Sequence, residues 1–334
     1  MGAKSGIEWT DASWTPIRAR NRATGKVGWH CAHVSEACRN CYAEGMNRRL
    51  GTGLDYKPGN LDAVDIFLDE KMLLAPLKWR KPRKIFICST TDLFGDWVKD
   101  EAIDRIFAVM ALVPQHTFQV LTKRPKRMRE YLSRSTGPID KRAAEIGHAQ
   151  MAIVNQIRKA PIGIAWGPTH LRLPLPNVWL GVTAENQETA DARIPDLLAT
   201  RAAVRFVSVE PMLSAIDLRC LHYDGVTNID ALTGTHGLTS AEDCARIDWC
   251  IAGGESGPHA RPSHPEWFRS LRDQCKTAEV PYFFKQWGEF APGHRAPAHS
   301  PEEMFRVGKK TAGRLLDGVE YSEFPPASTG MEER

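Results

Sequence analysis

The chain has 334 residues, of which 42% are hydrophobic and 25% charged, and its formal net charge at pH 7 is +4. A chain of this length can bury a large core, and its composition is that of an ordinary globular protein. It contains no apolar run of the roughly 18 residues that a membrane span needs. Its first residues also lack the apolar segment of a secretory signal peptide. We therefore expect a cytoplasmic protein with no membrane partner.

Three of the eight cysteines, Cys31, Cys38 and Cys41, lie close together with the spacing C-x6-C-x2-C. In a cytosolic protein such a cluster indicates metal or redox chemistry more often than disulfide bonds. Two interpretations fit the spacing. In the first, the thiolates hold a structural zinc ion, with His30 or His33 as the fourth ligand. In the second, they bind three irons of a [4Fe-4S] cluster and leave the fourth iron open to a small molecule.

From about residue 84 the sequence alternates short β-type runs with amphipathic segments. This alternation indicates a parallel sheet covered on both faces. With an N-terminal unit around the cysteines there are about six or seven β/α units, which favours a full or partial (β/α) barrel. The predicted strands are 84–88, 117–121, 178–182, 204–209, 249–252 and 281–284, and the predicted helices are 101–112, 124–132, 189–198 and 265–278.

Polar residues occur where each predicted strand ends. In a β/α barrel these positions converge on the carboxyl face of the strands, where catalytic and binding residues are placed. We therefore expect one lined site beside the cysteines. The strand-end residues are Ser89, Thr90, Thr91 and Asp92; Thr122, Lys123 and Arg124; Thr183, Glu185 and Asn186; Glu210; Gly253, Gly254, Glu255 and Ser256; and Lys285, Gln286 and Trp287.

Two stretches interrupt the alternation and are expected to be loop insertions, at about 134–175 (with a helix over 141–159) and 219–247. The barrel is expected to span 1–298, with a C-terminal tail or capping segment over 299–334. Two basic runs are either solvated helix starts or a phosphate-facing rim. They comprise Lys78, Arg80, Lys81, Arg83 and Lys84, and Lys123, Arg124, Lys126, Arg127 and Arg129.

Ordered stretches along almost the whole chain resemble one family. They are IEWTDASWTP, CRNCYAE, STTDLFGDWV, LTKRP, WLGVTAEN, RFVSVEPML, WCIAGGESGPHARP, FFKQWGE and AGRLLDG. The chain resembles the phage Gp37/Gp68 family, which looks like a divergent branch of the radical S-adenosylmethionine (SAM) superfamily near the spore photoproduct lyase group. The resemblance implies a (β/α)6-type partial TIM barrel, a [4Fe-4S] cluster and SAM as cofactors.

The resemblance also implies roles for residues. Cys31, Cys38 and Cys41 match the three cluster ligands. Ser89, Thr90 and Asp92 match the strand end that contacts SAM, and strand order places Thr183, Glu185 and Glu210 around its ribose and amino-acid moiety. Lys123, which would pair with the SAM carboxylate, and Glu255 are the catalytic candidates. Two positions depart from the superfamily pattern: the first cysteine gap has six residues instead of three, and Asn40 stands where an aromatic residue usually precedes the last cysteine.

Three hypotheses follow. The first is a radical SAM enzyme that modifies a nucleic acid or nucleotide and receives electrons from a donor protein, with Lys285, Gln286 and Trp287 on the substrate side. The second is a zinc-stabilised nucleic-acid-binding protein without catalysis. The third is an assembly subunit with a degenerate barrel. The sequence leaves the substrate and the oligomeric state open.

Overall fold

A computed structural model describes residues 5–133, 140–157, 171–223, 227–236, 245–293 and 303–326. Its centre is a seven-stranded sheet in which each neighbouring pair of strands is parallel. The order is β1 (Ala12–Trp14), β5 (Lys84–Ile87), β6 (Thr117–Thr122), β7 (Val178–Thr183), β8 (Val204–Val209), β12 (Trp249–Gly253) and β13 (Tyr282–Gln286).

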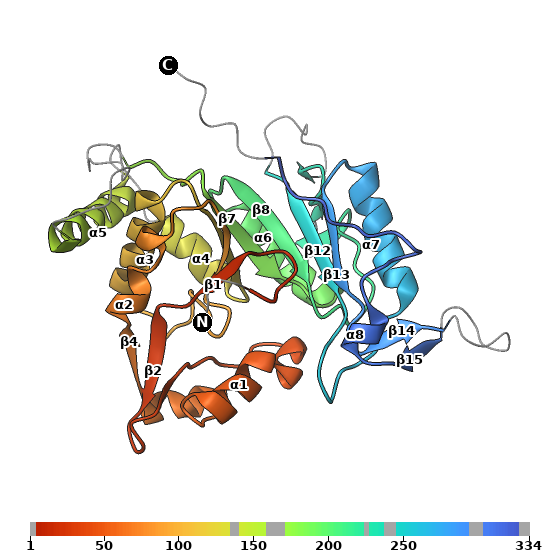
Figure 1. The fold of residues 1–334 in the computed structure, drawn as a ribbon. Coiled ribbons are helices and arrows are strands. Elements are labelled where there is room, and N and C mark those ends of the chain that lie inside the picture. The colour runs from red at the N-terminus through yellow and green to blue at the C-terminus, as the bar shows by residue number, and fades with distance from the viewer. Residues whose placement is uncertain are drawn as a thin grey trace.

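Spatial order follows chain order across this sheet, with β1 at one edge and β13 at the other (Figure 1). Every crossover therefore advances in one direction, as in a β/α barrel and unlike a doubly wound sheet. The curved, open sheet is a half-barrel. This confirms the predicted barrel-like α/β class, with seven strands in the sheet.

The outer face of the half-barrel is covered by the helices between its strands. They are α3 (Asp100–Leu112), α4 (Pro125–Leu132), α6 (Gln187–Leu198) and α7 (Pro265–Thr277). Each predicted helix is present within a few residues of its expected limits. The start of α6 is fixed by a capping box, in which Asn186 accepts from the Thr189 amide and the Thr189 hydroxyl accepts from the Asn186 amide, so the chain turns sharply after β7.

The inner face is filled by aromatic side chains instead of helices. Trp9, Phe86, Trp179, Phe206, Trp249 and Phe283 form one buried cluster there. Gly181 on β7 leaves the space for this layer, because a Cβ at that position would lie 2.5 Å from the Phe206 ring. The aromatic layer fills the interior of the half-barrel and supports the loops that follow its strands.

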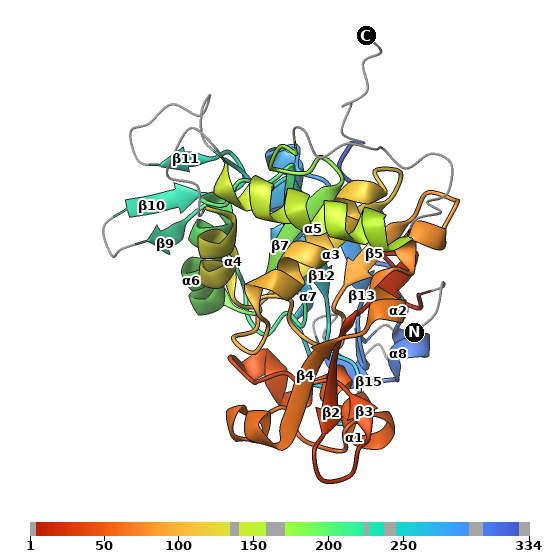
Figure 2. The same cartoon turned by 90° about the vertical axis from the view of Figure 1, so that its left-hand side faces the viewer.

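Between β1 and β5 the chain makes a long excursion that carries the cysteines. It contains a three-stranded antiparallel sheet of β3 (Val27–Gly28), β2 (Ile17–Asn21) and β4 (Val64–Leu68), the helix α1 (Tyr42–Leu50) and the short helix α2 (Glu70–Leu73). Figures 1 and 2 show α1 and this small sheet at one end of the central sheet. The sequence predicted a unit around the cysteines but neither its antiparallel sheet nor strand β1.

The two predicted insertions differ in structure. The first contains α5 (Lys141–Ile157), which packs on α3 through Ala143, Ile146 and Ile153; residues 158–170, including the predicted end of this helix, lie outside the described part. In the second, β9 (Leu221–Tyr223), β10 (Thr227–Asp230) and β11 (Thr235–His236) form a small sheet.

The described part of the C-terminal segment packs closely on the half-barrel. Strand β15 (Met304–Arg306) pairs with β14 (Phe290–Pro292), and the short helix α8 (Lys309–Ala312) follows. Further along, Phe324 packs on Trp249 with 5.0 Å between ring centroids. Residues 299–302 and 327–334 of the predicted tail lie outside the described residues. No helix in the described ranges is long and apolar enough to cross a membrane.

Candidate functional site

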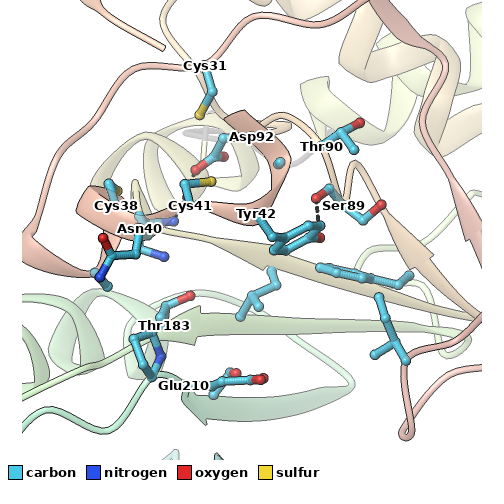
Figure 3. A pocket seen from close by; sticks show the side chains of 18 of the residues that line it. Cys31, Cys38, Asn40, Cys41, Tyr42, Ser89, Thr90, Asp92, Thr183 and Glu210 are labelled. Carbon is cyan, nitrogen blue, oxygen red and sulfur yellow. Dashed lines mark hydrogen bonds between the residues drawn. The ribbon is translucent and has the colours of Figure 1, made fainter. Parts of the chain in front are cut away.

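A cavity of about 410 Å³ lies at the carboxyl ends of the half-barrel strands, between them and the cysteine segment. Its walls include residues that end or follow β5, β6, β7, β8, β12 and β13, as predicted from the strand ends. Figure 3 labels Ser89, Thr90 and Asp92 after β5, Thr183 at the end of β7 and Glu210 after β8. The predicted site residues that line it are Cys31, Cys38, Cys41, Ser89, Thr90, Thr91, Asp92, Thr122, Lys123, Arg124, Thr183, Glu210, Gly254, Glu255, Ser256, Lys285 and Gln286.

The three cysteines lie on one side of this cavity (Figure 3). Cys38 lies in a 3-10 turn over Glu36–Asn40, and Cys41 is the residue before the first turn of α1. A small apolar cluster of Trp29, Ala43 and Tyr56 packs behind Cys31 and Cys41. All three thiols are free and half-buried, so each sulfur has a protein side and a cavity side.

Burial favours the protonated thiol at Cys31 and at Cys41. It raises the pKa of the Cys31 thiol to about 12, and the nearby carboxylate of Asp92 acts in the same direction. Burial also raises the pKa of Cys41, although the backbone N–H groups of Ala43 and Glu44 at the start of α1 oppose that rise. Binding of a metal or cluster at these sulfurs would therefore release protons.

A single-ion site and a multi-iron site make different demands on these sulfurs. Ligands of one tetrahedral zinc ion lie about 4 Å apart, since each is about 2.3 Å from the metal. The described residues contain no group of three His, Cys, Asp or Glu gathered closely enough to hold one metal ion. In an iron–sulfur cluster each thiolate binds a different iron, so the sulfurs are spread further apart.

The two histidines proposed as a fourth zinc ligand have other surroundings. His30 is buried edge-on against Trp97, with 4.9 Å between ring centroids. Burial is the main cause that lowers its pKa to about 4. His33 Nε2 lies 3.3 Å from a carboxylate oxygen of Glu44. Neither histidine is among the residues that line the cavity.

Asp92 has hydrogen-bond donors at both carboxylate oxygens. Oδ1 accepts from the Thr122 hydroxyl at 2.7 Å and the Phe94 amide at 2.9 Å. Oδ2 accepts from the Lys123 amide and from Arg124 Nη1, both at 3.0 Å. The carboxylate therefore joins the ends of β5 and β6. Because its oxygens already accept these hydrogen bonds, it is less able to bind a ligand than the hydroxyls of Ser89 and Thr90.

Glu210 and Lys285 form an ion pair at the cavity, across from the cysteines. The distance from Lys285 Nζ to Glu210 Oε1 is 2.6 Å, and both side chains are largely shielded from solvent. A paired cation and anion present a donor beside an acceptor. Lys123 also lines the cavity and forms no salt bridge with a described residue, so its ammonium is available to an anionic ligand.

Four expected strand-end residues lie away from the cavity lining: Glu185, Asn186, Gly253 and Trp287. Glu185 is fully buried and bonded to Arg193 Nη1 at 2.8 Å, which makes it a support for the turn after β7. Trp287 is buried, and its Nε1 donates to the Leu315 carbonyl at 2.8 Å. Trp287 therefore packs within the fold, whereas its neighbour Gln286 does face the cavity.

The structure adds lining residues that sequence reasoning missed. Tyr42 has 58% of its surface exposed, and its hydroxyl donates to the Ser89 carbonyl at 2.5 Å (Figure 3). Its position directly after the last cysteine was the available signal. Lys309 arrives from α8, far along the chain, and lies 3.3 Å from Glu8. Nothing in the local sequence around Lys309 indicated the site.

The two basic runs have different positions. The first run ends at Lys84, the first residue of β5, so it lies at the amino end of the sheet, opposite the cavity. In the second run the arginines are ion-paired: Arg124 with Asp92, Arg127 with Asp100 and Arg129 with Asp196. If this run faces phosphates, only its lysines can therefore contribute positive charge that no carboxylate neutralises in the described residues.

The fold and the site define an α/β protein with an open parallel half-barrel and a three-cysteine cavity at the carboxyl ends of its strands. The family described as Protein of unknown function (DUF5131) matches residues 4–325, and the chain belongs to this family. No curated protein and no solved structure matches the chain.

Proposed function

We propose that the protein is a radical SAM enzyme. The observation that carries this proposal is the position of Cys31, Cys38 and Cys41 on one wall of a cavity at the carboxyl ends of a parallel half-barrel. A structural metal site has no need of a lined cavity, whereas an open iron must face the space where its ligand binds.

The residues at the cavity fit a [4Fe-4S] cluster. Three free thiols supply one ligand to each of three irons, and the cavity lies against their exposed side. When bound, a [4Fe-4S] cluster supplies the electron that cleaves the sulfonium of SAM and yields a 5′-deoxyadenosyl radical. Lys123 would hold the SAM carboxylate, and the hydroxyls of Ser89, Thr90 and Thr183 would orient its polar groups. The buried aromatic layer beneath excludes water from the reacting space.

We further propose a nucleic acid or nucleotide as the substrate, with an electron-donor protein as partner. Its support is the lysines at the cavity: Lys123 forms no salt bridge with a described residue, and Lys285 and Lys309 approach from two other segments, each paired with a carboxylate. Cationic side chains that converge on an open cavity suit a phosphate-bearing molecule. The Glu210–Lys285 pair adds a donor next to an acceptor, which suits the polar edge of a base.

The test is anaerobic reconstitution followed by iron and sulfide analysis and an assay of SAM cleavage with dithionite. We expect four irons per chain and release of 5′-deoxyadenosine, both abolished by Cys31→Ala, Cys38→Ala or Cys41→Ala. Cys220→Ala is the matched control, because Cys220 is also free and half-buried but lines no part of this cavity. A colourless protein with stoichiometric zinc, or with no metal at all, would contradict the proposal.

A further inference from the structure

One ion-pair network joins the cysteine segment to the loop after β12. Arg261 donates three hydrogen bonds to the Glu255 carboxylate: Nη2 to Oε1 at 2.7 Å, and Nε and the backbone N–H to Oε2, both at 2.8 Å. Across the cavity wall, Arg261 Nη1 donates to Glu36 Oε1 at 2.8 Å. The Asn40 amide donates to Glu255 Oε2 at 3.1 Å and to the His259 carbonyl at 2.8 Å.

The contacts of this network fall on the two unusual positions of the cysteine motif. Glu36 lies inside the six-residue gap between Cys31 and Cys38, and Asn40 directly precedes Cys41. An aromatic side chain in place of Asn40 has no amide to bond Glu255 and His259 at once. The long gap and the asparagine thus have one structural explanation: Glu36 within the gap binds Arg261, and Asn40 binds its partner Glu255.

The other end of the motif is fixed separately. Arg124 Nη2 donates to the Ala32 carbonyl at 3.1 Å, and the Thr91 hydroxyl donates to the His30 carbonyl at 2.6 Å. These contacts hold the backbone around Cys31 against the ends of β5 and β6. The residues between Ala32 and Cys38 need a second anchor, because a longer flexible segment has more conformations to lose when its ligands converge.

The chemistry of the Glu255–Arg261 pair suits an anchor. Glu255 is only 6% exposed, and hydrogen bonds from Arg261 hold the pKa of its carboxyl below the usual value against the opposing effect of burial. A two-pronged guanidinium–carboxylate contact fixes direction as well as distance. Both carboxylate oxygens already accept hydrogen bonds, so Glu255 acts on the reaction indirectly, by holding the cysteine segment in place.

We infer that Glu255 and Arg261 are positioning residues that hold Cys38 and Cys41 in the geometry required to bind the cluster. This inference rests on the proposed function. It reassigns Glu255, expected from the sequence to be catalytic, and it adds Arg261, which the sequence did not single out. Loss of the anchor frees the 3-10 turn that carries Cys38, so the cluster binds less tightly and its surroundings become heterogeneous.

The test compares Arg261→Gln, Arg261→Lys and Glu255→Gln with the native chain after anaerobic reconstitution. We expect iron loss to a chelator to accelerate about 10- to 100-fold in Arg261→Gln, as is common when the residues that support metal ligands are removed. Arg261→Lys should retain iron better than Arg261→Gln but less well than the native chain, because an ammonium keeps the positive charge but cannot make the two-pronged contact of a guanidinium. The electron paramagnetic resonance signal of the reduced cluster should broaden in Arg261→Gln and Glu255→Gln.

Arg269→Gln is the matched control, since Arg269 makes a similar two-pronged contact with Asp317 outside the cavity. Thermal unfolding of the metal-free proteins checks the fold. If Arg261→Gln does not fold, Glu36→Ala and Asn40→Ala carry the test, because each removes one link and leaves the buried pair intact. Iron retention and spectra that match the native chain in these variants would overturn the anchor alone, whereas a native chain that takes up no iron would overturn the proposed function as well.

Discussion

Arg124 Nη1 lies 3.0 Å from Asp92 Oδ2, and its Nη2 reaches the carbonyl of Ala32 at 3.1 Å. One guanidinium therefore joins the end of β5, the start of α4 and the segment that carries Cys31. Its plane also lies over the Trp97 ring, with 4.7 Å from Cζ to the ring centroid. The pair is a structural support of the cavity wall, and the neighbouring Lys123 forms no salt bridge within the part of the chain that the structure describes.

Arg124→Met should destabilise the protein by about 3 kcal/mol, at the low end of the range for a broken buried pair because Asp92 keeps its other donors. Urea unfolding measures the change. Arg22→Met is the control, since the Arg22–Asp65 pair is exposed on both sides and such pairs contribute about 1 kcal/mol or less. Equal losses in the two variants would contradict a supporting role for Arg124.

Gly181→Ala tests the aromatic layer beneath the cavity. The added Cβ would lie 2.5 Å from the Phe206 ring, and overpacking of this kind costs about 1–3 kcal/mol. The double variant Gly181→Ala, Phe206→Leu should recover most of the loss because it removes the clashing ring. Gly59→Ala meets nothing within 4 Å and serves as the control. Unchanged unfolding midpoints for Gly181→Ala would show that the layer is loosely packed.

The sheet was predictable because its strands are buried on both faces. Strands such as β7 and β8 appear in the sequence as near-continuous apolar runs, and polar residues mark where they end. β1 and the antiparallel sheet around β2 escaped prediction because their strands are short or mixed in polarity. Their stability comes from pairing with residues distant in sequence, such as β1 with β5.

Site membership was predictable from strand order, whereas side-chain roles were not. Most strand-end residues line the cavity because the sheet aligns the strand ends. Whether a carboxylate is free or bonded depends on partners elsewhere in the chain: Glu185 faces Arg193, and Glu255 meets Arg261 and Asn40. The contribution of Lys309 depends on how the C-terminal segment packs, which no local pattern encodes.

His116 should make stability depend on pH. It is buried, its Nε2 lies 3.1 Å from the Trp79 carbonyl, and burial is the main cause that lowers its pKa from 6.5. The unfolded chain binds a proton near pH 6.5 that the folded chain resists, so the contribution of His116 is complete above that pH. It is lost as the pH falls from 6.5 through the lower pKa of the folded state.

Comparison with His116→Gln isolates this effect. The difference in unfolding free energy between the native chain and the variant should shrink from pH 7.5 to pH 5.5. Urea unfolding at the two pH values measures it. A difference that stays constant or grows at the lower pH would mean that the folded state accommodates the imidazolium.

Lys123→Ala tests binding of a nucleic acid at the cavity in the protein without SAM, whose carboxylate Lys123 would otherwise hold. Lys123 lines the cavity without a salt bridge to any described residue, so its ammonium is free to contact a phosphate. Loss of one such contact should weaken binding of a single-stranded oligonucleotide and reduce the slope of log K against log salt by about 0.7. Lys81→Ala is the control, because Lys81 is exposed at the amino end of the sheet, opposite the cavity. Equal effects of the two substitutions would indicate that the oligonucleotide binds over the general basic surface instead of at the cavity.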